Sequence, residues 1–168
     1  MSADPSTRED LEAAFGGAYR HIDRTNWNTT SVVGDVYGYL DALERLLAQL
    51  SVTDRDLVVF VGDLVRKGPE TSGVLELVRN APNMLSVRGD NEQKLLDGAA
   101  SLPDFAETEC RFMALLPVGL GWEGGLVVHG VVDPRKPLRS HGRDDVANAF
   151  ARRPNVRERV NPLPSSPR

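Results

Sequence analysis

Three short apolar runs in this sequence each end in the pair Gly-Asp, and the pairs recur at nearly equal spacing. The runs are SVVGD, LVVFVGD and LSVRGD, and their acids are Asp35, Asp63 and Asp90, which lie 28 and 27 residues apart. A stretch with the apolar periodicity of a helix follows each pair. Strands that alternate with helices in this way favour parallel pairing with right-handed crossovers. The sequence therefore predicts an α/β fold built from successive βα units.

The expected elements follow from residue type and period. β-Branched, apolar runs closed by glycine predict strands at 30–34, 57–62 and 84–88. The second of these runs is apolar throughout, which is typical of a strand buried on both faces. Apolar residues at helical spacing predict helices within 39–50, 69–80 and 91–100. Further on, VGLGWEGGLVVHG predicts a hairpin within 117–130 that turns at Glu123, Gly124 and Gly125.

These elements suggest how the chain is organised. We expect a polar N-terminal segment at 1–28 with a short helix around Asp10 to Ala18, and an α/β domain at 29–150. The stretch at 151–168 is rich in Pro, Arg and Ser, so we expect it to be disordered. A chain of 168 residues is long enough for one domain with a sizeable core.

Composition excludes several classes of function. The net charge of −4 provides no basic surface for nucleic acid, and no apolar run is long enough to cross a membrane. Cys110 is the only cysteine, which excludes an intramolecular disulfide and a cysteine-rich zinc site. The N-terminus lacks the pattern of a signal peptide. We therefore expect a cytoplasmic protein that binds neither nucleic acid nor membrane.

The three aspartates should meet at one edge of the sheet. Ligands of open parallel sheets bind at the carboxyl ends of the strands, where all three acids are expected. Each preceding glycine lets the chain turn without a Cβ clash, and VVHG places His129 at the end of another strand. Carboxylates that converge repel one another unless a divalent cation joins them, and an added imidazole favours Mn²⁺, Fe²⁺ or Zn²⁺. The alternative is that each Asp only caps a helix.

At these motifs the chain resembles the metallophosphoesterase (calcineurin-like) superfamily, in the branch of serine/threonine protein phosphatases and symmetrical diadenosine tetraphosphatases. That branch carries GDxHG, GDxxDRGP, RGNHE and a later HGG, in this order. The corresponding segments here are GDVYG (Gly34 to Gly38), GDLVRKGP (Gly62 to Pro69), RGDNE (Arg88 to Glu92) and HGVVDP (His129 to Pro134). The resemblance covers roughly residues 30–138. It implies a sandwich of mainly parallel βα units plus a hairpin, which this chain would leave incomplete at its C-terminal side.

The resemblance also implies roles for single residues. Asp35 matches an aspartate of the first metal, and Asp63 matches the carboxylate that bridges two metals. Asp90 stands where the family has Asn, and His129 stands where it has a histidine of the second metal. Two bridged cations would activate a water for attack on phosphorus. Lys67 stands where the family binds phosphate with arginine, so it keeps the charge but loses the bidentate geometry.

Three departures from the family motifs bear on activity. Tyr37 replaces a histidine of the first metal, and a neutral phenol is a poor ligand near pH 7. Asn91 replaces the histidine that acts as general acid, and Arg66 replaces the aspartate that orients it. The family's later GHT histidine has no counterpart, since His141 is the only histidine after His129. The acid–orienter pair is therefore substituted at both positions.

Two classes of function remain open from the sequence. The first is a metal-dependent phosphoesterase with weakened activity, which would act on a phosphorylated small molecule, a nucleotide or a phosphoprotein. The second is a non-catalytic relative that binds phosphate or metal, or a decayed and truncated paralogue. We expect one weakly held divalent ion with Asp63, Asp90 and His129 as its ligands, with Mn²⁺ as the first choice and Mg²⁺, Fe²⁺ or Zn²⁺ still open.

Overall fold

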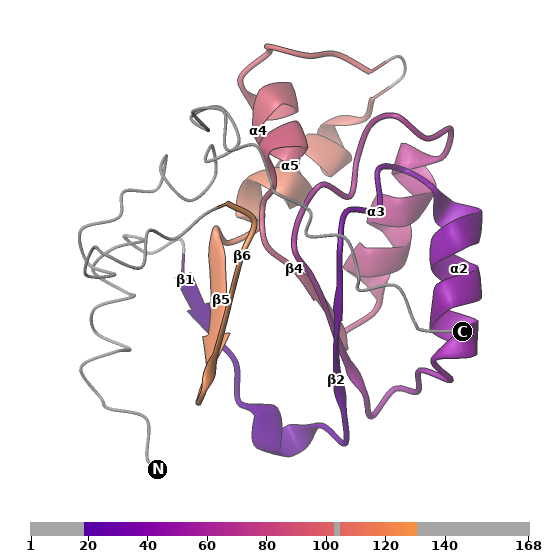
Figure 1. The fold of residues 1–168 in the computed structure, drawn as a ribbon. Helices are drawn as coiled ribbons and strands as arrows, with labels where there is room; N and C mark the ends of the chain where they lie inside the picture. The colour runs from indigo at the N-terminus through magenta and orange to yellow at the C-terminus, as the bar shows by residue number, and fades with distance from the viewer. Residues whose placement is uncertain (1–18, 103–104, 131–168) are drawn as a thin grey trace, which may run out of the picture.

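The computed structural model describes residues 19–102 and 105–130, which Figure 1 draws in colour. The helix expected around Asp10 to Ala18 lies outside these residues, as do His141 and the tail at 151–168. Within the described ranges, none of the helices has the length and apolar character that crossing a bilayer requires.

The three Gly-Asp units form one parallel sheet, as the sequence predicts. Its strands are β2 (Thr30–Val33), β3 (Leu57–Phe60) and β4 (Met84–Ser86), in the order β2-β3-β4. The register pairs Val33 with Phe60 and Phe60 with Ser86. The carboxyl ends of the three strands are therefore level, and the loops that carry the Gly-Asp pairs leave the sheet at one edge.

A second sheet contains the predicted hairpin. β5 (Gly119–Trp122) and β6 (Gly125–Val128) pair antiparallel around a turn at Glu123 and Gly124. β1 (Tyr19–His21) pairs parallel with β5, which gives the order β1-β5-β6. The sequence analysis did not predict β1, because its three residues are mostly exposed and carry no periodicity. Its pairing with a distant strand makes it a strand.

Helices cover the parallel sheet on the side away from the hairpin, where Figure 1 shows α2 and α3. The described helices are α2 (Leu40–Gln49), α3 (Thr71–Asn80), α4 (Asp90–Leu96), α5 (Glu107–Leu115) and the 3-10 turn η1 (Arg24–Asn26). The first three confirm the expected helices. α4 ends before residue 100 because Gly98 takes a φ of 70°, the left-handed conformation that ends many helices. α5 was not predicted, since only Glu109 and Met113 of its residues are buried.

The core has two parts, one on each face of β3. Val58 and Phe60 pack with the helices, whereas Leu57 and Val59 pack with the second sheet and its residue Leu120. Successive side chains of a strand point to opposite faces, and all four β3 residues are fully buried. The expectation of a strand buried on both faces is confirmed. The buried strand β3 therefore fixes the position of the loop that follows it, which carries Asp63.

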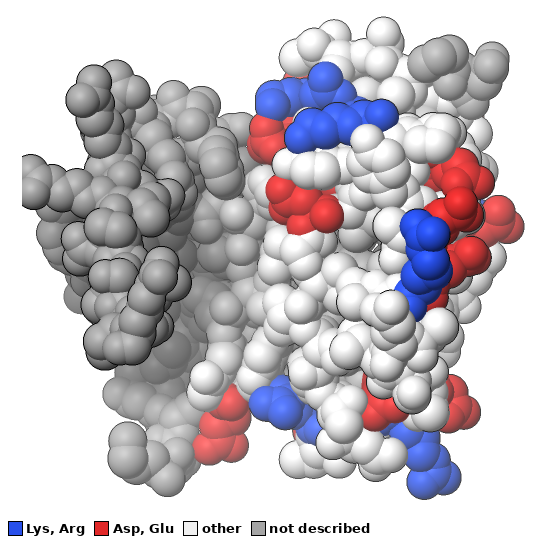
Figure 2. Space-filling model, turned by 45° about the vertical axis from the view of Figure 1, so that its right-hand side comes forward, with Lys and Arg blue, Asp and Glu red and all other residues white. Residues whose placement is uncertain are grey.

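The surface shows no continuous basic area on the face drawn in Figure 2. There, Lys and Arg side chains alternate with Asp and Glu, and large areas carry neither charge. A positively charged groove is the usual footprint of nucleic-acid binding, and this face of the described residues offers none.

Candidate metal centre

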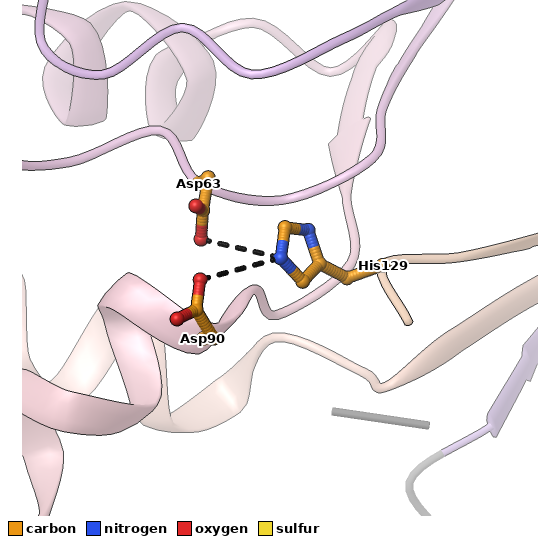
Figure 3. Close-up of side chains that lie close together, drawn as sticks. All are labelled: Asp63, Asp90 and His129. Atoms are coloured by element: carbon orange, nitrogen blue, oxygen red, sulfur yellow. Dashed lines mark ion pairs between the residues drawn. The ribbon is translucent and has the colours of Figure 1, made fainter. Parts of the chain in front are cut away.

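Asp63, Asp90 and His129 come together at the carboxyl edge of the parallel sheet, as Figure 3 shows. Asp63 lies in the loop after β3, Asp90 is the first residue of α4, and His129 directly follows β6. Each offers one ligand atom, and these atoms all lie within 4.8 Å of one another. Residues 66 positions apart in the sequence thus form one site, at the place that the Gly-Asp pattern predicts.

The orientation of the His129 ring suits a cation between the two acids. Its Nδ1 lies 2.8 Å from the carbonyl oxygen of Val61. A carbonyl can only accept a hydrogen bond, so Nδ1 carries the proton and Nε2 of the neutral ring presents its lone pair. Nε2 lies 3.5 Å from Asp63 Oδ1 and 3.4 Å from Asp90 Oδ1. A lone pair that faces two carboxylates is stable only with a positive charge among them, which a proton or a metal ion supplies.

The chemistry of these ligands fits a divalent ion. Two carboxylate oxygens and one imidazole nitrogen suit Mn²⁺, Fe²⁺ or Zn²⁺. The hydrogen bond from His129 to Val61 is the kind of outer contact that fixes the tautomer of a metal-binding histidine. The side chains of His129 and Asp63 are each 4% exposed, and that of Asp90 is 20% exposed. The site is therefore shielded from solvent on the side of β3 and accessible to solvent on the side of α4.

The two acids of this trio differ in their electrostatics. Burial raises the pKa of Asp63 to about 7, against the opposing effects of the Asn91 backbone N–H and of His129. Burial also acts on Asp90, but its hydrogen-bonded ion pair with Lys94 and its contact with Asp63 bring the pKa of Asp90 below the ordinary value. Of the two acids, Asp63 is therefore the weaker acid.

Close packing of two loops explains two of the three glycines. Gly62 has a φ of 93°, and a Cβ there would lie 2.6 Å from the Gly89 nitrogen. A Cβ on Gly89 would lie 2.3 Å from Asp63 Oδ1. These glycines let the loop after β3 touch the start of α4. The same reason does not hold for Gly34, where a Cβ would meet no atom within 4 Å, so the expectation that all three glycines serve a tight turn is wrong there.

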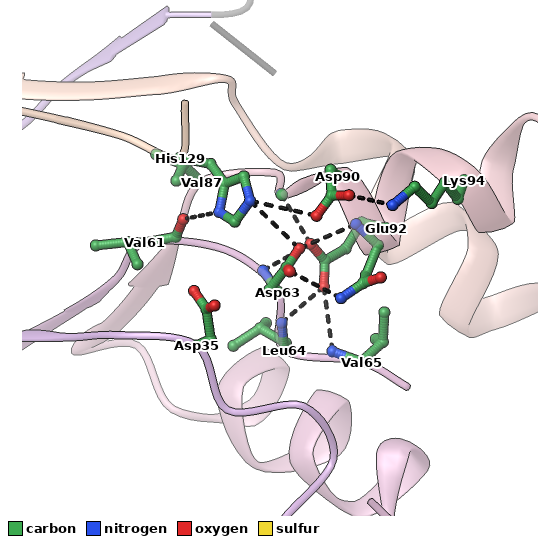
Figure 4. Close-up of polar contacts among 12 residues, drawn as sticks. Asp35, Val61, Asp63, Leu64, Val65, Val87, Asp90, Glu92, Lys94 and His129 are labelled. Carbon is green, nitrogen blue, oxygen red and sulfur yellow. Dashed lines mark hydrogen bonds and ion pairs between the residues drawn. The ribbon is translucent and has the colours of Figure 1, made fainter. Parts of the chain in front are cut away.

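Asp35 lies beside the trio but does not share its ligand sphere. The residue is exposed, and its Oδ2 accepts a hydrogen bond from the Tyr37 hydroxyl at 2.6 Å. The Lys67 ammonium lies 3.2 Å from the centroid of the Tyr37 ring, a cation–π contact. In Figure 4 Asp35 stands at the side of the cluster, with no drawn contact to the other acids. Asp35 is thus engaged by Tyr37, and its role as a metal ligand stays a prediction.

Neighbouring groups raise the pKa of both Tyr37 and Lys67. The hydrogen bond to Asp35 raises the pKa of the Tyr37 phenol. The pKa of Lys67 is raised first by Tyr37 and further by the charges of Asp63 and Asp35. Lys67 is therefore a permanent cation at neutral pH, and two carboxylates of the site act on its charge.

The two substituted positions of the family's acid pair contact each other. Arg66 Nη1 donates to Asn91 Oδ1 at 2.9 Å, and Asn91 Nδ2 donates to Asp63 Oδ2 at 2.7 Å. The backbone N–H of Asn91 also donates to Asp63 Oδ1, at 2.9 Å. These contacts fix the side-chain amide, with its oxygen toward Arg66 and its nitrogen toward Asp63. A continuous chain of donors therefore runs from the guanidinium to Asp63.

Comparison with known proteins identifies the family. The family model described as "Calcineurin-like phosphoesterase" matches residues 29–162. The chain belongs to this family. Serine/threonine-protein phosphatase 1 of Salmonella typhimurium is 40% identical over 84 residues, which are 49% of this chain and 38% of that protein. Serine/threonine-protein phosphatase 2 of Escherichia coli is 40% identical over 94 residues, which are 55% of this chain and 38% of that protein.

A tetraphosphatase and a solved structure also match part of the chain. A symmetrical bis(5'-nucleosyl)-tetraphosphatase of Pectobacterium atrosepticum is 40% identical over 70 residues, which are 40% of this chain and 25% of that protein. A crystal structure described as a candidate diadenosine tetraphosphatase has a TM-score of 0.69 and 27% identity, and the match covers 77% of this chain and 61% of that one. The chain thus spans 38% or less of the length of these three curated relatives.

One residue of this calcineurin-like site was undervalued in the sequence analysis. The side chain of Glu92 is fully buried and accepts four backbone N–H groups. They belong to Asp63 at 2.9 Å, Leu64 at 2.7 Å, Val65 at 3.2 Å and Gly89 at 2.7 Å (Figure 4). Burial raises the pKa of Glu92, and these hydrogen bonds oppose the rise. Glu92 joins the loop of Asp63 to that of Asp90, and the last letter of RGDNE was the signal for it.

Backbone strain is concentrated in the same loops. Five non-glycine residues in the described ranges have a positive φ, and four of them lie at this site. The four are Tyr37 (56°), Asp63 (54°), Arg66 (72°) and Lys67 (64°). Left-handed conformations are costly for residues with a Cβ and gather where surrounding contacts enforce them, often at functional sites. Here the contacts of Glu92 and Asn91 hold Asp63 in its strained conformation.

Proposed function

We propose that the chain is a metal-dependent phosphoesterase domain that holds one divalent ion, with Mn²⁺ as the first choice, and hydrolyses phosphate compounds weakly. The observation that carries this proposal is the approach of His129 Nε2 to carboxylate oxygens of both Asp63, at 3.5 Å, and Asp90, at 3.4 Å, in a chain that belongs to a phosphoesterase family. When bound, the ion would supply Lewis-acid charge and lower the pKa of a water molecule. Asp63, Asp90 and His129 would hold the ion in place.

The chain's own residues would bind the phosphoryl group and leave the departing oxygen without a proton. Lys67 is exposed and charged next to the trio, so it can pair with phosphoryl oxygens. Asn91 has no acidic proton to give, and the Arg66 guanidinium cannot be deprotonated in a protein. General acid catalysis is typically worth a factor of about 10² to 10⁴. Hydrolysis should therefore be slow when the departing oxygen is a strong base.

This missing acid suggests the class of substrate. Aryl phosphates and phosphoanhydrides release a weakly basic oxygen, whereas an alkyl ester such as phosphoserine does not. We propose nucleotide phosphoanhydrides or small activated esters as substrates ahead of phosphoproteins. The names of the relatives include both protein phosphatases and a dinucleotide tetraphosphatase, so they favour neither class. Action in the cytoplasm is a further part of the proposal, and it rests on the sequence alone.

A second candidate function follows from the contact between Arg66 and Asn91. That hydrogen bond uses the amide oxygen of Asn91 and leaves its nitrogen on Asp63. A domain arranged in this way can bind metal and phosphate and still fail to turn over. The second candidate is therefore a non-catalytic phosphate-binding relative, which uses the same trio and the same lysine.

Hydrolysis of 4-nitrophenyl phosphate with saturating Mn²⁺ separates the two candidates. We expect slow turnover that is lost in Asp63→Asn and kept in Asp41→Asn, a matched change on the exposed side of α2. Rates across aryl phosphates should depend steeply on the pKa of the leaving group. Asn91→His combined with Arg66→Asp should flatten this dependence more than either change alone. No turnover in the wild type and in this double variant would refute hydrolysis and leave a binding function or a decayed paralogue.

A further inference from the structure

Arg66 and Lys67 are adjacent in the chain, but their side chains contact loops on opposite sides of Asp63. The Lys67 ammonium lies over the ring of Tyr37, in the loop after β2, whereas the Arg66 guanidinium donates to Asn91, in the helix after β4. Asp63 lies between them, because its carbonyl accepts the Tyr37 N–H at 2.8 Å and its Oδ2 accepts the Asn91 side chain at 2.7 Å. Two cations therefore flank a carboxylate of the candidate metal centre.

The guanidinium of Arg66 is held in place at both ends of the residue. The Arg66 N–H donates to the Thr71 hydroxyl at 3.1 Å, and the Arg66 carbonyl accepts the Gly68 N–H at 2.8 Å. The backbone of Arg66 has a φ of 72°, which is costly for a residue with a Cβ. Its partner Asn91 is 5% exposed and is fixed by its own N–H, which donates to Asp63. These contacts orient the arginine before any ligand binds.

Most of the donors on the Arg66 guanidinium are available to a ligand. Its Nη1 donates to Asn91 at 2.9 Å, and within residues 19–102 and 105–130 no other acceptor meets a nitrogen of this side chain. Arg66 is half-buried, and none of its nitrogens is both buried and without a partner. The remaining N–H groups therefore reach solvent. A guanidinium can bind two oxygens of one phosphoryl group at once, which an ammonium cannot do in a fixed geometry.

We propose that Arg66 binds a second phosphoryl group, so that this site prefers substrates in which a bridging oxygen joins two phosphoryl groups. The inference rests on the proposed function, in which Lys67 and the metal-binding trio bind the phosphoryl group that is attacked. A second phosphoryl group would then lie on the side of α4, where Arg66 meets Asn91. A monoester has no such group, so it would leave the donors of Arg66 unused.

The charge of Arg66 also suits the hydrolysis of a diphosphate. Water forms a bond to the terminal phosphorus, and the bond from that phosphorus to the bridging oxygen breaks. The leaving phosphate keeps the electron pair; one proton of the water stays on the released inorganic phosphate and the other passes to solvent. The negative charge of the leaving phosphate is spread over several oxygens, which a fixed guanidinium can stabilise without giving up a proton. The oxygen of an alkyl leaving group needs a proton, and Arg66 cannot supply it.

Binding of AMP and of the methylene analogue of ADP, measured by isothermal titration with saturating Mn²⁺, tests this inference. AMP has one phosphoryl group, and the analogue has two that hydrolysis cannot separate. The wild type should bind the analogue more tightly than AMP. Arg66→Gln should weaken binding of the analogue by roughly tenfold or more, because two charged hydrogen bonds are lost, and should leave the affinities for AMP and Mn²⁺ unchanged.

Two further variants separate charge, geometry and general effects of an arginine substitution. Arg66→Lys keeps the charge but loses the bidentate geometry, so its affinity for the analogue should fall between those of the wild type and Arg66→Gln. Arg45→Gln, a matched change on the exposed side of α2, should behave as the wild type. In hydrolysis, Arg66→Gln should raise the KM for ADP and leave kcat/KM for 4-nitrophenyl phosphate unchanged.

The inference and the proposed function fail in different ways. Equal affinity of the wild type for AMP and the analogue would overturn the inference, as would an Arg66→Gln variant that loses affinity for neither or for both to the same extent. Equal losses would show that Arg66 supports only the fold or the first phosphoryl group. A wild type that neither binds AMP nor hydrolyses 4-nitrophenyl phosphate would instead refute the proposed function.

Discussion

Substitution of Glu92 by Gln replaces only one oxygen by an NH₂ group, but it should destabilise the protein strongly. The carboxylate accepts four backbone N–H groups, two on each oxygen. A glutamine keeps one oxygen and turns an NH₂ group toward the other two donors. A hydrogen bond to a charged group contributes about 1.5–3 kcal/mol, so two lost bonds amount to roughly 3–6 kcal/mol. Relief from burying a charge offsets part of this, and we expect a loss of about 3 kcal/mol in unfolding free energy.

Glu109→Gln is the matched control for this measurement. Glu109 is also buried, at 8% exposure, but its carboxylate accepts one backbone N–H, from Ala106 at 2.7 Å. Glutamine can still accept that bond, so the expected loss is at most about 1 kcal/mol. Urea denaturation in chelator, followed by far-UV circular dichroism, gives both values. Equal losses in the two variants would show that Glu92 acts only as a helix-start residue, and would refute the role in joining the loops.

Three further predictions concern pH and the anchoring of α5. Burial raises the pKa of Asp63 from 3.8 to about 7, so the contribution of Asp63 to the stability of the metal-free protein should be greatest below pH 3.8 and should be lost as pH rises toward 7. Melting temperatures in chelator, compared between the wild type and Asp63→Asn, should show this dependence in the wild type only. Asp56 accepts hydrogen bonds from Thr53 and Thr29, which lower the pKa of Asp56. The stability that the Asp56 carboxylate gives the folded protein should therefore be lost as pH falls below 3.8. An Asp56→Asn variant should show a smaller fall in melting temperature on acidification than the wild type. Arg88 Nη2 donates to two carbonyls at the end of α5, at 2.7 and 3.0 Å. Arg88→Lys should therefore lower the unfolding free energy measured by urea denaturation by about 2 kcal/mol. An unchanged unfolding free energy would show that these contacts are dispensable.

The trio could be predicted from sequence because its geometry follows from topology. Asp63 and Asp90 come at the ends of parallel strands, and level strand ends bring such residues together whatever the helices between them do. His129 follows a strand of the hairpin in the same way. The strands themselves were predicted within about two residues because β-branched runs closed by glycine leave little choice. Local pattern and global fold agree at these positions.

The contacts within the loops could not be predicted in this way. The pairing of Arg66 with Asn91 joins residues 25 positions apart, and it depends on a left-handed backbone at Arg66 that no local pattern announces. Glu92 lies in the first turn of α4, where the helix dipole alone would explain a negative charge, so its place in the sequence does not indicate its contacts with the other loop. Asp35 ends its strand at the expected edge, but the Tyr37 hydroxyl binds it there. In these cases the strand positions were predictable from the sequence, but the side-chain partners were not.

The departures from the family motifs each have a partner in the structure, and this bears on whether the site has decayed. Tyr37, where the family has histidine, donates to Asp35. Asn91, in place of the acid, accepts from Arg66, in place of the orienting aspartate. Asp90 adds a charge where the family has Asn, and Lys94 one helical turn later pairs with it. Random loss would leave buried polar groups without partners, because nothing selects a second change to match the first. Three departures that each have a partner at one site favour a remodelled centre over a decayed one, and they support our proposal that this centre binds a ligand.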